Sequence, residues 1–244
     1  MAPVKFRRAG ASIVDPELWL IDIAASAAAL EGAEAKQPLL SRSDGERIAS
    51  LSDADMRQAR RVSHIALRLL IERAFGSAWR QKPYIISESG KPLLEGLEGG
   101  FSLSHTRGIA LIGLSPKGAI GVDIERARPV RIPQGRRDAL EHAGIVLAGG
   151  IPLQGDDPDE RLLMAWVRFE AVAKAEGCGI GPLLARFGLG RREIAAEMVD
   201  IDFLAHDVEA GSGVFAAAAL PVGLAPGEPR RLPHTAEGLA ALIS

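Results

Sequence analysis

Apolar and polar residues alternate along the run Ile-Gly-Val-Asp-Ile-Glu at positions 120–125. This period of two predicts a strand whose aliphatic side chains face a core, while Gly121, Asp123 and Glu125 point to the other side. The two carboxylates then lie about 6.6 Å apart, since each residue of a strand rises about 3.3 Å. At that separation their oxygens can share one small, hard cation directly or through water. We expect Gly121, which has no side chain, to leave room beside them for a ligand.

A second pattern, with a helical period, covers residues 158–176. Asp157 can cap a helix there, Pro158 suits the first helical position, and Glu160 stands three residues after the cap. Gly177 would end the helix. Both boundaries of this helix are therefore predicted.

Two stripes of this helix differ in character. One is apolar and would face the core, because its members recur at helical spacing: Leu162, Trp166, Phe169 and Ala173. The adjoining stripe carries Glu170 and Lys174, which lie four residues apart and therefore on one edge. A carboxylate that completes a metal shell and an ammonium group that neutralises phosphate oxygens suit phosphoryl transfer, where positioning and charge stabilisation provide most of the catalysis.

The rest of the pattern predicts helices interspersed with short strands. Residues 16–20 are typical of a strand, residues 23–35 of either a helix or a loop, and residues 52–75 of a capped helix that Gly76 ends. Runs rich in β-forming residues, separated by Gly and Pro, predict further strands at 84–87, 101–104, 109–114, 119–125, 198–204 and 214–220. We expect a short helix at 136–143 and another after Thr235.

Composition narrows the class of protein. Of the 244 residues, 47% are hydrophobic, which is ample for a core, and 29 basic against 31 acidic residues leave a net charge of −2. This balance gives no support for nucleic acid or a membrane surface as a partner. The single Cys178 excludes an internal disulfide framework and a cysteine-rich zinc site, and the five histidines show no close ligand spacing.

No secretory leader is evident, because the apolar stretch at 23–30 is short, rich in alanine and preceded by acidic residues. A later apolar stretch, 214–224, contains Pro221 and is far shorter than the roughly 20 residues that a membrane-spanning helix needs. We therefore expect a cytoplasmic protein that does not enter a membrane.

Two more motifs lie upstream of the acidic strand. One is a Gly-Lys-Pro turn that contains Lys91, and the other is the run Phe-Ser-Leu-Ser-His at 101–105. A Gly-x-Asp-x-Glu strand and a helix whose motif begins at Trp166 follow them in order and at fitting spacing. In these four motifs the chain resembles the surfactin-type 4'-phosphopantetheinyl transferases, and the resemblance covers about residues 51–181.

The resemblance implies transfer of the 4'-phosphopantetheine group from coenzyme A to a serine of an acyl or peptidyl carrier protein, with release of 3',5'-ADP. It implies an α+β fold of two similar halves in a pseudo-dimer, each a small antiparallel-rich sheet packed on a long helix. We expect residues 1–116 to form the half that contacts the coenzyme's phosphates. Residues 117–244 would form the half with the metal site and the catalytic helix. A monomer is expected from this two-half arrangement.

Residue roles follow from the resemblance, position by position. Asp123, Glu125 and Glu170 are similar to the ligands of a magnesium ion. Glu170 is also similar to the base that takes the serine proton, and Lys174 to the cation that contacts the diphosphate.

Other positions are similar to groups that hold the coenzyme. Lys91, Ser104 and His105 match groups that bind its phosphates, a role that suits an ammonium, a hydroxyl and an imidazole. Arg61 or Arg68, by position on the helix at 52–75, could also reach a coenzyme phosphate, although charged helix faces are commonly solvated.

One position departs from the family pattern. A lysine usually stands immediately before the helix glutamate, where this chain has Phe169. The nearest cation, Arg168, lies about 100° away around the helix, and the apolar stripe places Phe169 in the core. Loss of one charge-stabilising group costs comparable sites about 10²- to 10³-fold in rate. Two alternatives therefore stay open: a degenerate relative that binds coenzyme A or a carrier without efficient transfer, and a magnesium-dependent nucleotide diphosphate hydrolase.

Overall fold

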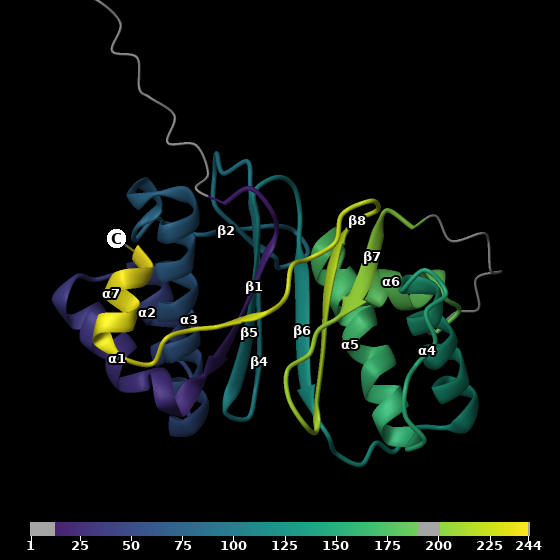
Figure 1. Ribbon diagram of the computed structural model, residues 1–244. Helices are drawn as coiled ribbons and strands as arrows, with labels where there is room; N and C mark the ends of the chain where they lie inside the picture. The colour runs from purple at the N-terminus through teal and green to yellow at the C-terminus, as the bar shows by residue number, and fades with distance from the viewer. Residues whose placement is uncertain (1–12, 190–200, 244) are drawn as a thin grey trace, which may run out of the picture.

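Two small sheets lie face to face between two groups of helices in the computed structural model, which describes residues 13–189 and 201–243 (Figure 1). The chain is mixed α+β, and its layers follow the order helices, sheet, sheet, helices. Each outer layer of helices covers one sheet and shares a hydrophobic core with it.

The first half begins with a strand that leads directly into helices. Its elements are β1 (Glu17–Asp22), α1 (Ile23–Lys36), α2 (Arg42–Ala49), α3 (Ala54–Phe75), the 3₁₀ turn η1 (Ser77–Trp79), β2 (Ile85–Ile86), β3 (Pro92–Leu93), β4 (Gly100–Thr106) and β5 (Ile109–Ser115). Strands β2 and β3 form a small separate hairpin. Strand β5 pairs antiparallel with both β1 and β4, so β1 and β4 flank it in the main sheet.

The second half has the same order of strands. Its elements are β6 (Gly121–Arg126), α4 (Gln134–Leu147), α5 (Pro158–Glu176), α6 (Ile180–Arg186), β7 (Phe203–Asp207) and β8 (Val214–Pro221). Strand β8 lies between β6 and β7 and pairs antiparallel with both. The first strand of each half therefore occupies the same place in its sheet, and a long helix, α3 or α5, packs on each sheet.

The end of the chain returns to the first half. Strand β9 (Arg230–Arg231) pairs parallel with β1, and α7 (Ala236–Ile243) lies beside α1 and α3 (Figure 1). Leu232 and Leu239 are buried in the core that these helices share. The boundary expected near residue 116 falls in the link between β5 and β6, but the tail contributes its side chains to the first half.

The two sheets bury a third core between them. Leu20 of β1, Leu111 of β5 and Val122 of β6 belong to it, and all three are buried. We expected only one face of β6 to be buried. Asp123, on its other face, is just 3% exposed because α5 covers that face as well.

Several predicted boundaries are confirmed. The Asp157 carboxylate accepts the N–H of Asp159 at the start of α5, and Gly177 ends the helix with a φ of 68°, which glycine adopts without steric cost. Helix α3 ends at Gly76 as predicted, and the Asp53 carboxylate caps its start, so the helix begins at Ala54, two residues after the predicted start.

Other elements differ from the prediction. The ambiguous stretch at 23–35 is the helix α1, and α4 is longer than expected. The elements α2, η1, β3, α6 and β9 were not predicted. Helix α2 begins with a reciprocal capping box between Ser41 and Asp44. The strand expected at 198–204 lies partly outside the described residues, and β7 begins at Phe203.

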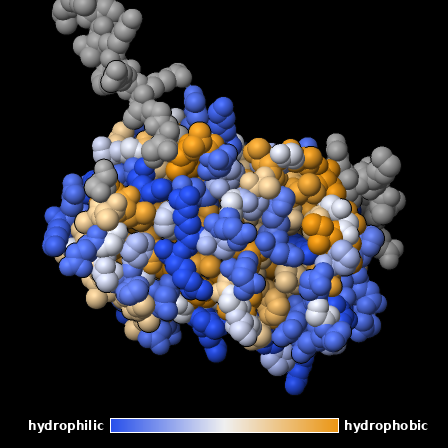
Figure 2. Space-filling model, in the orientation of Figure 1, coloured by the Kyte–Doolittle hydropathy of each residue, from blue (hydrophilic) through white to orange (hydrophobic). Residues whose placement is uncertain are grey.

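The surface carries both hydrophilic and hydrophobic residues. Hydrophilic and hydrophobic side chains are interspersed over both halves on the face in Figure 2. Within the part of the chain that the structure describes, no helix is both long enough and apolar enough to cross a bilayer.

Candidate active site

A cavity of about 590 Å³ opens between the two halves. The first half contributes residues of α2, α3, the β2–β3 hairpin and β4, and the second contributes α5 and the loop after it. Several residues that the sequence singled out line this cavity: Lys91, Ser104, His105, Glu170 and Lys174. The fold therefore gathers motifs from both halves at one place.

Asp123 and Lys174 lie at the centre of the polar contacts beside the cavity. Lys174 Nζ donates to Asp123 Oδ1 at 2.6 Å and to Ser104 Oγ at 3.1 Å. Ser104 Oγ donates to the same aspartate oxygen at 2.7 Å, and Lys174 Nζ lies 3.6 Å from Glu170 Oε2. The serine comes from β4, the aspartate from β6 and the other two from α5, so only the packed halves create this cluster.

Glu170 has an unusual acidity. Burial raises its pKa to about 7, the nearby Asp123 carboxylate raises it as well, and Lys174 acts in the opposite direction. A carboxyl group with a pKa near neutrality is a suitable proton acceptor, because general bases work best when their pKa lies close to the operating pH.

The carboxylates fit a hard divalent cation. Asp123 Oδ2 is buried and has no hydrogen-bond partner among the described residues, a state that costs free energy unless a ligand satisfies it. Carboxylate oxygens are the ligands that Mg²⁺ prefers, and Glu170 lies close enough to Asp123 for its pKa to respond. Within residues 13–189 and 201–243, however, no three His, Cys, Asp or Glu side chains form a group that could hold a metal.

Glu125 is the predicted ligand that stays apart. It lies on the same face of β6 as Asp123, but its carboxylate pairs with Arg128 at 3.6 Å and is 25% exposed. Two of the three predicted carboxylates therefore meet. Glu170 on α5 lies close enough to Asp123 for that carboxylate to raise its pKa, and Glu125 is not among the groups that shift it.

Lys91 reaches across the cavity to the second half. Its Nζ donates to the carbonyl of Ala175 at 3.0 Å, and the nearby Ser89 hydroxyl donates to the carbonyl of Gly177. The last carbonyls of a helix lack partners within the helix, so these contacts cap α5. Burial lowers the pKa of Lys91 to about 8.

His105 ends the β4 motif, and its pKa is lowered. Burial is the largest cause, and the positive charges of Arg60 and Lys174 add to it. The imidazole is therefore biased toward its neutral form, which carries one N–H donor and one acceptor nitrogen.

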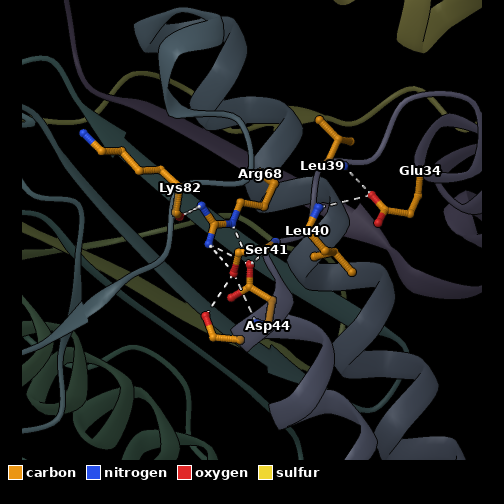
Figure 3. Close-up of polar contacts among 8 residues, drawn as sticks. Glu34, Leu39, Leu40, Ser41, Asp44, Arg68 and Lys82 are labelled. Carbon is orange, nitrogen blue, oxygen red and sulfur yellow. Dashed lines mark hydrogen bonds and ion pairs between the residues drawn. The ribbon is translucent and has the colours of Figure 1, made fainter.

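Arg61 and Arg68 do not line the cavity. Arg61 Nε donates to both carboxylate oxygens of Glu31, at 2.8 and 2.9 Å. Arg68 is 2% exposed, and its guanidinium binds the Asp44 carboxylate and the Lys82 carbonyl, each at 2.6 Å (Figure 3). Both guanidinium groups are held in contacts within the first half, so neither is available to a coenzyme phosphate as the structure stands.

Sequence reasoning missed Arg60 and His64, which both line the cavity from α3. Their spacing of four residues places them on one stripe of the helix, and the sequence contained this signal. It did not indicate that this stripe, rather than the one with Arg61, faces the second half. Adjacent helix residues point about 100° apart, so Arg60 meets the cavity while its neighbour meets Glu31.

Phe169 is a core residue. It is fully buried, its ring stacks on Trp166 at a centroid distance of 6.3 Å, and Phe187 contacts it edge-on. Arg168 does not supply the missing charge to the cavity, because it too is fully buried and makes two hydrogen bonds to Asp207 of β7, at 2.6 and 2.7 Å.

Gly121 does not leave room for a ligand, so that expectation is wrong. A Cβ at this position would lie 2.0 Å from the Ala171 carbonyl oxygen and 2.4 Å from the Ala175 nitrogen. The absent side chain instead lets β6 lie directly against the backbone of α5. This close approach brings Asp123 within reach of Lys174.

A second hollow, of about 320 Å³, lies on α4 and α5 of the second half. Its lining is mostly apolar, including Leu140 and Trp166, and Arg128 and Arg136 are its charged members. We call it the apolar groove. Trp166 precedes Glu170 by about one turn of the same helix, so one end of the groove lies about one helical turn from Glu170.

Comparison with known proteins identifies similar enzymes. The chain is 32% identical over 138 residues to the 4'-phosphopantetheinyl transferase AcpT of Salmonella typhimurium, a match that covers 52% of this chain and 67% of the relative. It is equally similar, over the same shares, to the 4'-phosphopantetheinyl transferase AcpT of Salmonella typhi. No protein-family model matches the chain.

Proposed function

The chain belongs to the 4'-phosphopantetheinyl transferase family, and we propose that it transfers phosphopantetheine from coenzyme A to a serine of an acyl or peptidyl carrier protein. We also propose that it belongs to the surfactin-type group and is a pseudo-dimer; the four motifs and the shared strand order of the two halves support this. We also propose that the protein is a monomer and acts in the cytoplasm.

The observation that carries the proposal is the contact of Lys174 with Asp123, Ser104 and Glu170 at a cavity between the halves. An ammonium group flanked by carboxylates suits both ligands, because the ammonium can contact a diphosphate while the carboxylates hold a divalent cation. In the reaction, the carrier serine oxygen bonds to the phosphorus that bears pantetheine. The bond from that phosphorus to the bridging oxygen breaks, and 3',5'-ADP leaves.

Asp123 and Glu170 would hold the magnesium ion, with Glu125 as a third ligand if it exchanges Arg128 for the metal. Bound there, the ion supplies charge neutralisation for the diphosphate. Lys174 would offset charge that develops on the leaving phosphate, as cations do in other phosphoryl transfers.

Glu170 is the proposed base. Without the metal, burial and the Asp123 carboxylate raise its pKa to about 7, and the carboxylate would accept the serine proton directly or through water. Lys91, Ser104 and His105 would position the nucleotide end of coenzyme A from the first half of the cavity wall.

The apolar groove is the proposed carrier-docking surface. Arg128 and Arg136 add positive charge to an apolar lining, a combination that complements an amphipathic helix with an acidic side. A carrier helix bound there would lie beside Trp166, about one turn of α5 from Glu170. Its serine would thus be held near the base and the diphosphate.

One assay separates this function from its alternatives. The chain is incubated with an apo carrier protein, coenzyme A and Mg²⁺, and both substrates are followed by mass spectrometry. A carrier that gains one phosphopantetheine group supports the transferase. Cleavage of coenzyme A without carrier modification indicates the nucleotide diphosphate hydrolase, and binding without either product indicates a degenerate binder.

A further inference from the structure

Two arginines join α4 to α5 in the second half, where the two helices lie side by side (Figure 1). Arg168 of α5 contacts α4 and the loop after it, and Arg137 of α4 contacts the start of α5. Neither side chain lines the cavity between the halves. The proposed chemistry therefore leaves both arginines without a role.

Arg168 is a fully buried cation whose donors are all used. Its five N–H donors make five hydrogen bonds: two to the Asp207 carboxylate, at 2.6 and 2.7 Å, and one each to the carbonyls of Gly144, Ile151 and Pro152. Gly144 belongs to α4, and the other two carbonyls belong to the loop between α4 and α5. A buried charge is costly unless its partners are well placed, so these contacts favour one position of α4 relative to α5.

Arg137 makes a second connection, at the start of both helices. Its guanidinium donates to the carbonyl of Pro158 at 2.7 Å and to the Asp159 carboxylate at 2.9 Å, and these two residues begin α5. It also donates to the Val130 carbonyl at 3.0 Å, in the segment between β6 and α4. The start of α4 is therefore tied both to α5 and to the segment that leads into α4.

Near Arg168 the backbones of the two helices lie in close contact. A Cβ at Gly144 would lie 2.7 Å from the Cα of Ala165, so the absent side chain permits this packing. The apolar groove adjoins the contact, because Leu140, one turn before Gly144, and Leu162, three residues before Ala165, both line it. The shape of the groove thus depends on how α4 packs on α5.

We propose that Arg137 and Arg168 are positioning residues that hold α4 against α5 and thereby shape the apolar groove for the carrier protein. This inference rests on the proposed function, which assigns the groove to the carrier. Both arginines act through the residues that line the groove. A docking surface that is ordered before binding loses less conformational freedom when its partner binds, so the two connections strengthen carrier binding by preorganisation.

The expected signature is a change confined to one substrate. Helix α4, which the structure describes in full, contributes no residue to the larger cavity, and the contact of Lys174 with Asp123 joins α5 to β6. Loss of either connection should therefore raise the KM for the carrier about five- to tenfold and leave kcat and the KM for coenzyme A unchanged. A residue needed only for stability would lower the amount of folded enzyme without this selective rise in KM.

Steady-state kinetics of the full chain with an apo acyl carrier protein and coenzyme A test the proposal. Arg168→Lys keeps the charge but loses the planar fork, so it cannot bind all three carbonyls and should raise the carrier KM. Arg137→Gln removes the second connection, whose carboxylate partner is partly exposed, so the test does not depend on the folding of the Arg168 variant. Gly144→Ala keeps both arginines but forces the helices apart, and it should raise the same KM.

Two control variants separate position from stability and from charge. Leu30→Ala removes a fully buried side chain from the core of the first half, so it should destabilise the protein and leave the carrier KM unchanged. Arg42→Gln breaks an exposed ion pair with Glu46 on α2 and should change neither stability nor KM appreciably. Urea unfolding of each variant measures its stability.

An unchanged carrier KM in the folded variants of Arg137, Arg168 and Gly144 would overturn the proposal. An equal rise in that KM in Leu30→Ala, or an equal rise in the KM for both substrates, would also overturn it. These results would show that the connections stabilise the fold without shaping the groove.

The fluorescence anisotropy of a labelled apo acyl carrier protein, which reports its Kd without turnover, distinguishes this failure from failure of the proposed function. Carrier modification with the same carrier KM and Kd in all variants removes the positioning role and leaves the transferase. Carrier binding that the variants weaken, without any modification, does the reverse. A chain that neither binds nor modifies the carrier counts against both.

Discussion

Lys174 Nζ lies 2.6 Å from Asp123 Oδ1, although the two residues are 51 positions apart and belong to a helix and a strand. Ser104, from the other half, contacts both partners. This contact joins the two acidic motifs of the sequence and sets them at the cavity between the halves.

Asp123→Asn should abolish most of the transfer activity, because an amide cannot supply the same anionic ligand or neutralise Lys174. We expect a loss of about 10²-fold or more in kcat, as for removal of one charge-stabilising group in comparable sites. The rate of carrier modification, measured by mass spectrometry, checks this loss in kcat. Asp138→Asn, on the exposed side of α4, is the control and should retain full activity.

Phe169→Lys, which restores the residue of the family pattern, should not raise the rate. The ring is fully buried between Trp166 and Phe187, so an ammonium there loses the packing and also buries a charge. We expect a loss of at least about 3 kcal/mol in unfolding free energy, the lower end for truncation of a buried phenylalanine. Denaturant unfolding measures it, and a faster enzyme of undiminished stability would contradict this interpretation.

His64 should make the ligand-free protein sensitive to acid. Burial lowers its pKa from 6.5 to about 4, so between these values the unfolded chain binds a proton that the folded chain does not. The free energy of unfolding should therefore fall as the pH drops from 6.5 to 4, by about 3 kcal/mol in all, at roughly 1.4 kcal/mol per pKa unit.

Urea titrations at several pH values check this dependence. His64→Gln removes the titrating group, so its stability should fall less steeply with decreasing pH over the same interval. Parallel curves for the two proteins would show that His64 does not cause the effect.

Arg136→Glu should impair carrier binding while leaving coenzyme A binding intact. The residue lies at the apolar groove and does not line the larger cavity. Reversal of its charge should raise the KM for an acidic carrier about tenfold, most strongly at low salt, where surface charges are least screened. Lys36→Glu, an exposed charge at the end of α1, is the matched control. An equal rise in KM in both charge-reversal variants would show that the groove is not the carrier-docking surface.

Local sequence patterns alone determined much of the secondary structure of this protein. The alternation in β6 and the cap, proline and glycine signals of α5 are short-range features, because strand pleating, capping and left-handed turns depend on residues a few positions apart. They correctly predicted where these elements lie and that Glu170 and Lys174 share an edge. The order of the motifs also indicated the enzyme family, which the similarity to AcpT supports.

Only the tertiary structure decided which side chains meet. Whether Arg60 or Arg61 faces the cavity depends on how α3 packs, since neighbouring positions of one helix can face solvent, core or ligand. Gly121 serves a close contact with α5 rather than a ligand, because the backbone that it meets, at Ala171 and Ala175, is distant in sequence. Glu125 pairs with Arg128, three residues further on, a local contact that the strand pattern did not specify. Periodicity specifies the faces of an element, while the choice of partner for each face is made by long-range packing.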